Sequence, residues 1–94
     1  MGARSKTAHA DFMNVELALC FTFADVAETN SKIGHPDSAQ SALNRAERGY
    51  ATLQHFLRDP KHSRHLPKED CRNITAGVER LRERLDALHS AVKL

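Results

Sequence analysis

The sequence predicts an all-α domain, built as a three-helix antiparallel up-down-up bundle. In three separate stretches of the 94-residue chain, apolar residues recur at the three- and four-residue spacing of a helix. The only three prolines lie between these stretches and leave their interiors uninterrupted. The connections are short, which favours antiparallel neighbours. At this length we expect residues 1–94 to form a single helical domain.

The first helix is expected over about residues 6–29, after a flexible tail at 1–5. Thr7 is a candidate N-cap, and Gly34 supplies a left-handed stop. Two apolar stripes run side by side along this helix and form one broad face. We expect two neighbouring helices to cover that face. The first stripe contains Phe12, Val15, Leu19, Phe23 and Val26, and the second contains Met13, Leu17, Cys20, Ala24 and Ala27.

The second helix is expected over residues 36–57, with Pro36 at a first position where no amide hydrogen is needed. Asp37 follows in the first turn, where negative charge is favourable. Apolar residues alternate at four and three residues along one seam, which indicates a single buried edge. That seam contains Ala39, Leu43, Ala46, Tyr50, Leu53 and Leu57.

The third helix is expected over residues 67–92, beginning at Pro67, and its charged remainder is expected to be solvated. Its seam repeats the same spacing and contains Ile74, Val78, Leu81, Leu85, Leu88 and Val92. Gly49 and Gly77 lie beside the seams of the second and third helices. Each glycine is either a tolerated weak point or a place where two helices approach closely.

Residues 20–53 resemble one tetratricopeptide repeat, a family unit of two antiparallel helices with small and large residues at fixed offsets. The matching positions are Phe23, Val26, Ala27, Gly34, Ala39, Leu43 and Ala46. Asn30 departs from the pattern where Tyr is usual, and Ala51 departs where Pro often closes the repeat. The resemblance implies a repeat-like hairpin followed by a long third helix. It also implies protein–protein binding rather than catalysis.

Composition excludes several functional classes. The formal charge of +2 means that binding to nucleic acid or to an anionic membrane would need a local basic patch. No apolar run approaches the roughly 20 residues needed to span a bilayer. Cys20 and Cys71 form no disulfide or metal-binding pattern, and the first residues form no secretory signal. We expect a cytoplasmic protein with reduced thiols that does not bind membranes.

The sequence contains no recognisable catalytic or nucleotide-binding motif, so we expect no enzyme and no cofactor. His62 and His65 are three residues apart, but zinc needs three or four ligands and the neighbouring residues are basic. We therefore expect no metal site. Cys71 lies near the start of the third helix, where its pKa could fall, but no base is placed beside it.

A basic loop over residues 58–68 offers an alternative function. It could hold a phosphate, an acidic protein or a nucleic acid, although no adjacent aromatic residue is available for base stacking. A solvated loop is the other interpretation. Its candidate residues are Arg58, Lys61, His62, Arg64, His65 and Lys68.

The sequence predicts a non-enzymatic helical module for protein–protein interaction or assembly, with either another protein or a second copy as partner. A homodimer would be one such assembly. This hypothesis predicts apolar residues that remain exposed once the core is assigned. Phe56 is a candidate because it lies beside the seam of the second helix, and Phe21 is a candidate because it lies off both stripes of the first helix. Each either widens the core or contributes to a partner surface.

Overall fold

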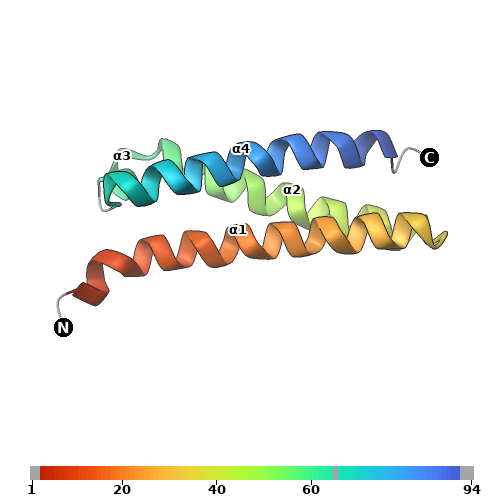
Figure 1. Ribbon diagram of the computed structural model, residues 1–94, viewed down its shortest axis with the longest axis horizontal. Coiled ribbons are helices and arrows are strands. Elements are labelled where there is room, and N and C mark those ends of the chain that lie inside the picture. Colours follow the sequence, from red (N-terminus) through yellow and green to blue (C-terminus); the bar gives the residue numbers. More distant parts are fainter. Residues whose placement is uncertain (1–2, 65, 92–94) are drawn as a thin grey trace.

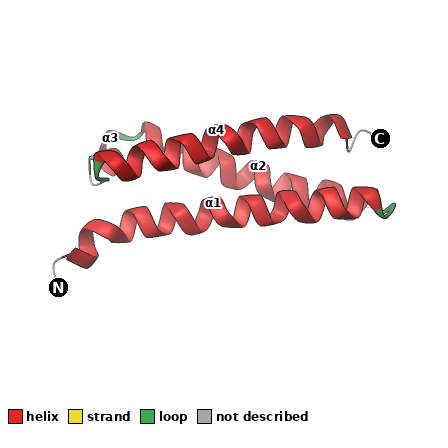
Figure 2. Ribbon diagram, in the orientation of Figure 1, coloured by secondary structure: helices red, strands yellow, loops and turns green. Residues whose placement is uncertain are grey.

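The computed structural model describes residues 3–64 and 66–91, with side chains for 11–61, 64 and 66–91. These residues form four helices and no strand: α1 (Ala3–Lys32), α2 (Pro36–Arg58), α3 (Pro60–Ser63) and α4 (Lys68–Ala91). The three long helices lie side by side along the long axis, and α3 is a single turn between α2 and α4 (Figures 1 and 2). The prediction of an all-helical fold with three long helices packed together is confirmed.

Helix α1 is longer than predicted at both ends. It begins at Ala3, inside the segment predicted to be a flexible tail, and Thr7 lies within the helix rather than at its N-cap. Residues 3–33 include no proline or glycine to stop a helix. At the other end, the side-chain amide of Asn30 donates a hydrogen bond to the carbonyl of Val26 at 3.0 Å. The helix continues past Asn30 to Lys32.

The turn between α1 and α2 is closed by Gly34, which has a φ of 83°. The amide of His35 donates to the carbonyl of Asn30 at 2.8 Å. The amide of Gly34 donates to the carbonyl of Ser31 at 3.3 Å. These two bonds form a Schellman motif, which satisfies carbonyls that the helix end would otherwise leave free. The predicted left-handed stop at Gly34 is confirmed. Pro36 then opens α2.

The seams of α2 and α4 form much of the core. Tyr50 and Leu57 are only half-buried, while Val92 lies outside the described residues. The remaining predicted seam residues are all buried: Ala39, Leu43, Ala46, Leu53, Ile74, Val78, Leu81, Leu85 and Leu88.

The two helical glycines mark places where α1 approaches its neighbours. A Cβ atom on Gly49 would overlap the Sγ atom of Cys20, and one on Gly77 would overlap the Cδ2 atom of Leu17. The absence of a side chain therefore brings α1 close to α2 at Gly49 and close to α4 at Gly77. The close-approach hypothesis is confirmed for both glycines.

Charged residues expected to be solvated instead link the helices. Arg82 of α4 donates to both carboxylate oxygens of Glu47 on α2, at 2.9 and 3.1 Å. Arg84 lies 2.6 Å from Asp25 of α1 and 3.3 Å from Glu28. Two arginines of α4 thus tie it to both other long helices.

The segment predicted to be a loop between α2 and α4 contains α3. The amide of Lys61 donates to the Oδ1 atom of Asp59 at 2.9 Å, which satisfies an amide in the first turn of α3. Leu66 is 7% exposed and packs into the core. Helix α4 begins at Lys68, and the carbonyl of Pro67 accepts its first bond from Cys71.

Candidate interaction surface

Only one of the two apolar stripes of α1 is covered by the other helices. In the second stripe, Met13, Cys20, Ala24 and Ala27 are each at most 2% exposed. The first stripe lies largely in solvent. The exposed fractions are 50% for Phe12, 59% for Val15, 44% for Leu19 and 41% for Val26, while Phe23 is half-buried. The prediction that both stripes would be covered is wrong for the first.

Small side chains explain which stripe is buried. Cys20, Ala24 and Ala27 of α1 share the core with Ala39, Ala42 and Ala46 of α2, and Gly49 accommodates Cys20. Small residues allow two helix backbones to approach closely, and dispersion attraction requires close contact. The larger residues of the first stripe would hold the helices apart. Packing is therefore centred on the second stripe.

We define the α1 stripe as the five large apolar residues that remain exposed along α1 and at the turn that directly follows it: Phe12, Val15, Leu19, Val26 and Ile33. Phe12, Leu19, Val26 and Ile33 are spaced seven residues apart. Val15, Thr22 and Thr29 fill the intervening positions of a 3-4 repeat, and both threonines are exposed. Such a repeat is typical of a helix–helix seam. At 1.5 Å per residue the α1 stripe extends over roughly 30 Å.

The exposed area of the α1 stripe is large for a chain of this size. Five large side chains, each between 41% and 60% exposed, lie on one face. We estimate their combined exposed area at about 400 Å², which falls in the range where patches on a monomer are often functional. The stripe is therefore the strongest candidate for a binding surface in the described part of the chain.

A shallow groove between α1 and α2 adjoins the α1 stripe. Its volume is about 260 Å³, and it is lined by Phe23, Val26, Asn30, Ser38, Ser41, Ala42 and Arg45. The guanidinium of Arg45 lies 5.7 Å from the ring centre of Phe23, which is a cation–π distance. The groove therefore has a largely apolar wall on α1 and a polar, basic wall on α2.

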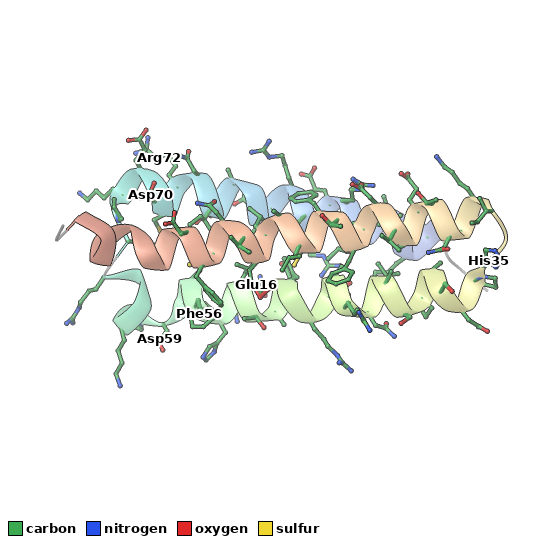
Figure 3. All side chains as sticks on the ribbon, turned by 90° about the horizontal axis from the view of Figure 1, so that it is seen from below. Glu16, His35, Phe56, Asp59, Asp70 and Arg72 are labelled. Carbon is green, nitrogen blue, oxygen red and sulfur yellow. The ribbon has the colours of Figure 1, made fainter. Side chains whose placement is uncertain are left out.

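The two phenylalanines proposed from sequence have different places. Both Phe21 and Phe56 are half-buried and pack against the core. Phe56 points from α2 toward α1 (Figure 3), where its ring meets that of Phe12 edge-on at 5.5 Å. Phe21 lies about 200° around α1 from Leu19, so it is not part of the α1 stripe. Phe56 borders the stripe and Phe21 does not.

The basic segment remains a separate region. Arg58, Lys61, Arg64 and Lys68 are all exposed, while the side chains of His62 and His65 lie outside the described residues. Arg58 lines a groove between α2 and α4, and Lys61 is on α3. Anion or nucleic-acid binding by this segment stays a prediction, and a strong dependence of binding on salt would support it.

A second groove, of about 480 Å³, lies between α2 and α4. Its polar side chains already bind one another. Gln54 donates to the hydroxyl of Tyr50 at 2.7 Å, and the Arg82 guanidinium lies 4.7 Å from the ring centre of Tyr50. Hydrogen bonds from Arg82 hold the pKa of Glu47 below its ordinary value of 4.5, with a smaller contribution from His89 and an opposing one from burial. A ligand would have to break these contacts, so this groove is a weaker candidate than the α1 stripe.

The cysteines and histidines add little chemistry to the described structure. Burial, together with the nearby Glu16 carboxylate, raises the pKa of the Cys20 thiol to about 11, as expected for an inert core cysteine. Among the described residues, no three His, Cys, Asp or Glu side chains are close enough to hold a metal ion. The predicted pair of His62 and His65 falls outside that search.

Within the described ranges, no helix combines the length and apolar character needed to cross a membrane. Comparison of the chain with known protein families, with curated proteins and with solved structures gives no match. Function therefore has to be argued from the chain's own residues, of which the α1 stripe is the most informative group.

Proposed function

We propose that this chain is a non-enzymatic helical module for protein–protein interaction or assembly, and that the α1 stripe is its binding surface. The observation that carries the proposal is a row of five large, exposed apolar residues with the spacing of a helix–helix seam. A partner helix with an apolar face would remove this row from water. The free energy gained would be about 25 cal/mol for each Å² of apolar surface covered.

The order of contacts supports an up-down-up bundle with one open position. Along α1, Phe12 meets Phe56 and Phe23 meets Arg45, so α2 runs back along α1. Leu17 packs against Gly77, and Glu28 accepts a hydrogen bond from Arg84. Because later residues of α1 meet later residues of α4, these contacts indicate that the two helices run in the same direction. The α1 stripe lies away from the side that contacts α4. A fourth helix laid on it would complete an arrangement common in helical bundles.

The similarity of residues 20–53 to a tetratricopeptide repeat points to the same functional class. In this proposal the hairpin of α1 and α2 is the repeat-like unit, with its binding residues on α1. The buried Cys20 thiol, whose pKa is raised to about 11, is a poor nucleophile at neutral pH, which agrees with a non-enzymatic proposal.

A photoreactive amino acid placed along α1 tests the proposal. We would introduce it at Val15, which is 59% exposed on the α1 stripe, and separately at Asn14, which is exposed but lies off the stripe. The protein would be irradiated in its native cells and the adducts identified by mass spectrometry. We expect protein adducts from position 15 and far fewer from position 14. Equal labelling at both positions, or none at position 15, would overturn the proposal.

A further inference from the structure

We infer that the partner of the α1 stripe is a second copy of this chain, docked antiparallel about a two-fold axis near Thr22. This inference rests on the proposed function and names its partner. A two-fold interface uses the same patch on both copies, so the patch must be complementary to itself. The apolar spacing, the flanking charges and the available area each meet this requirement.

Four of the five residues of the α1 stripe are spaced symmetrically about its middle. Phe12 lies as far before the midpoint as Ile33 lies after it, and Leu19 and Val26 are related in the same way. An antiparallel copy would place Phe12 against Ile33 of the second copy, and Leu19 against Val26 of the second copy. The midpoint of this pairing falls between Thr22 and Phe23, so Thr22 would lie beside Thr22 of the second copy, displaced by roughly 1.5 Å along the helix. Four of the five residues of the α1 stripe would thus meet an apolar residue of the second copy, and Val15 would lie close to Thr29 of the second copy.

Charges beside the α1 stripe favour the antiparallel orientation. Asp11 and Lys32 are exposed near its two ends, and each directly precedes a residue of the stripe, Phe12 or Ile33. In an antiparallel pair, Asp11 would lie near Lys32 of the second copy, and the symmetric contact would repeat at the other end. A parallel pair would instead bring Asp11 near Asp11 and Lys32 near Lys32. Opposite charges across a seam fix partner orientation, and like charges oppose it.

The area of the surface is sufficient for a modest dimer. The α1 stripe would contribute about 400 Å² from each copy if it were covered completely, which is a typical size for the largest apolar patch of a monomer. The walls of the adjoining groove, including Phe23 and Arg45, extend this surface. The total stays below the roughly 600 Å² per partner of the smaller specific interfaces, so we expect a weak dimer that forms at high protein concentration. Because α4 packs on another side of α1, it does not obstruct the approach of a second copy.

Sedimentation equilibrium of the purified chain from micromolar to millimolar concentration is the first test. We expect the mass to rise to that of a dimer. Leu19→Glu should weaken dimerisation at least about 100-fold, because it would bury two carboxylates in an apolar seam. Asn14→Glu adds the same charge to an exposed position off the α1 stripe and should leave dimerisation nearly unchanged. Circular dichroism would check that both variants remain helical.

Disulfide crosslinking tests the orientation, in a background where Cys71 is replaced by Ser. Thr22→Cys should crosslink to itself on oxidation because it lies at the two-fold axis. Val15→Cys alone should not crosslink, because its two copies would lie roughly 20 Å apart at 1.5 Å per residue. Mixing it with Thr29→Cys chains should give a crosslinked pair. Self-crosslinking by Val15→Cys would show a parallel pair and overturn the inference.

The remaining outcomes separate this inference from the proposed function. A chain that stays monomeric at every concentration overturns the second-copy inference. If position 15 still gives photo-adducts with a different protein, the proposed function stands. A dimer that Leu19→Glu does not weaken also overturns the inference, since the α1 stripe would not be its interface.

Discussion

The two apolar stripes of α1 differ in side-chain size and in burial, in opposite senses. Ala24 and Ala27 are 0% exposed, whereas Phe12 is 50% and Leu19 is 44% exposed. If apolar area alone decided burial, the larger side chains would be inside, because covering them removes more surface from water. The arrangement shows instead that close backbone approach decides which face packs. The stripe with the larger apolar side chains therefore stays exposed and is available for a partner.

The largest effect is expected from enlarging the buried stripe. Ala24→Leu would force extra methylene groups into a close contact and should lower the free energy of unfolding by about 1–3 kcal/mol. Ala18→Leu makes the same change at an exposed position of the same helix and should stay within about 0.5 kcal/mol of the wild type. Urea denaturation would measure both. Equal losses would mean that the small residues of α1 do not set the packing.

The contact between Cys20 and Gly49 provides a sharper test, because Gly49→Ala should change the free energy of unfolding in opposite directions in two backgrounds. Gly49→Ala should destabilise the fold by about 1–2 kcal/mol, because the new methyl group overlaps the Cys20 sulfur. In a Cys20→Ala background the overlap is absent. There the same substitution should stabilise by up to about 1 kcal/mol through helix propensity. A loss of equal size in both backgrounds would contradict close approach at this position.

Much of the fold follows from the sequence because it is encoded locally. Each of α2 and α4 has a single apolar seam, and Gly34 followed by Pro36 defines the turn between α1 and α2. Helix α1 has two equally regular stripes, so its own residues cannot decide which one is buried. That choice depends on Gly49 and Gly77, which are distant in sequence. The pairing of Arg82 with Glu47, 35 residues away, is non-local in the same way.

The candidate site was harder to predict than the fold. The sequence predicts Phe56 as a candidate for a partner surface, and Phe56 does border the α1 stripe, but the sequence predicts that the stripe itself is core. A usable signal was present in the exact seven-residue spacing from Phe12 to Ile33 and in the threonines at positions 22 and 29. Threonine is more often exposed than valine or leucine, so two threonines at seam positions favour a surface that is solvent-exposed in the free protein.

The contact between α2 and α4 depends on charge more than the contact between α1 and α2 does. Glu47→Gln should lower the free energy of unfolding at neutral pH by about 1 kcal/mol, a modest value because both side chains of the Arg82–Glu47 pair are about a third exposed. The pKa of Glu47 is lower in the folded state than in the unfolded state. Its stabilisation is therefore present above its ordinary pKa of 4.5 and is lost as pH falls through the folded-state pKa.

Denaturation curves recorded across the acidic range would check this expectation. The difference between the wild type and Glu47→Gln should shrink as the pH falls below 4.5. Glu79→Gln, an exposed change on α4, serves as the control and should show a smaller effect at neutral pH. A difference that is independent of pH would mean that the Glu47 charge does not stabilise the helix contact.

The smallest effect is expected on the α1 stripe in the isolated chain. Val15 is 59% exposed, so Val15→Ala should change the stability of dilute protein by less than about 0.5 kcal/mol. The same substitution at Val78, which is 5% exposed, should cost about 2 kcal/mol. If the α1 stripes of two copies associate, dimer formation stabilises the folded state by mass action. The cost of Val15→Ala should then grow with protein concentration. The cost at Val78 should depend far less on concentration. A cost at Val15 that stays constant between micromolar and millimolar protein would separate the α1 stripe from self-association.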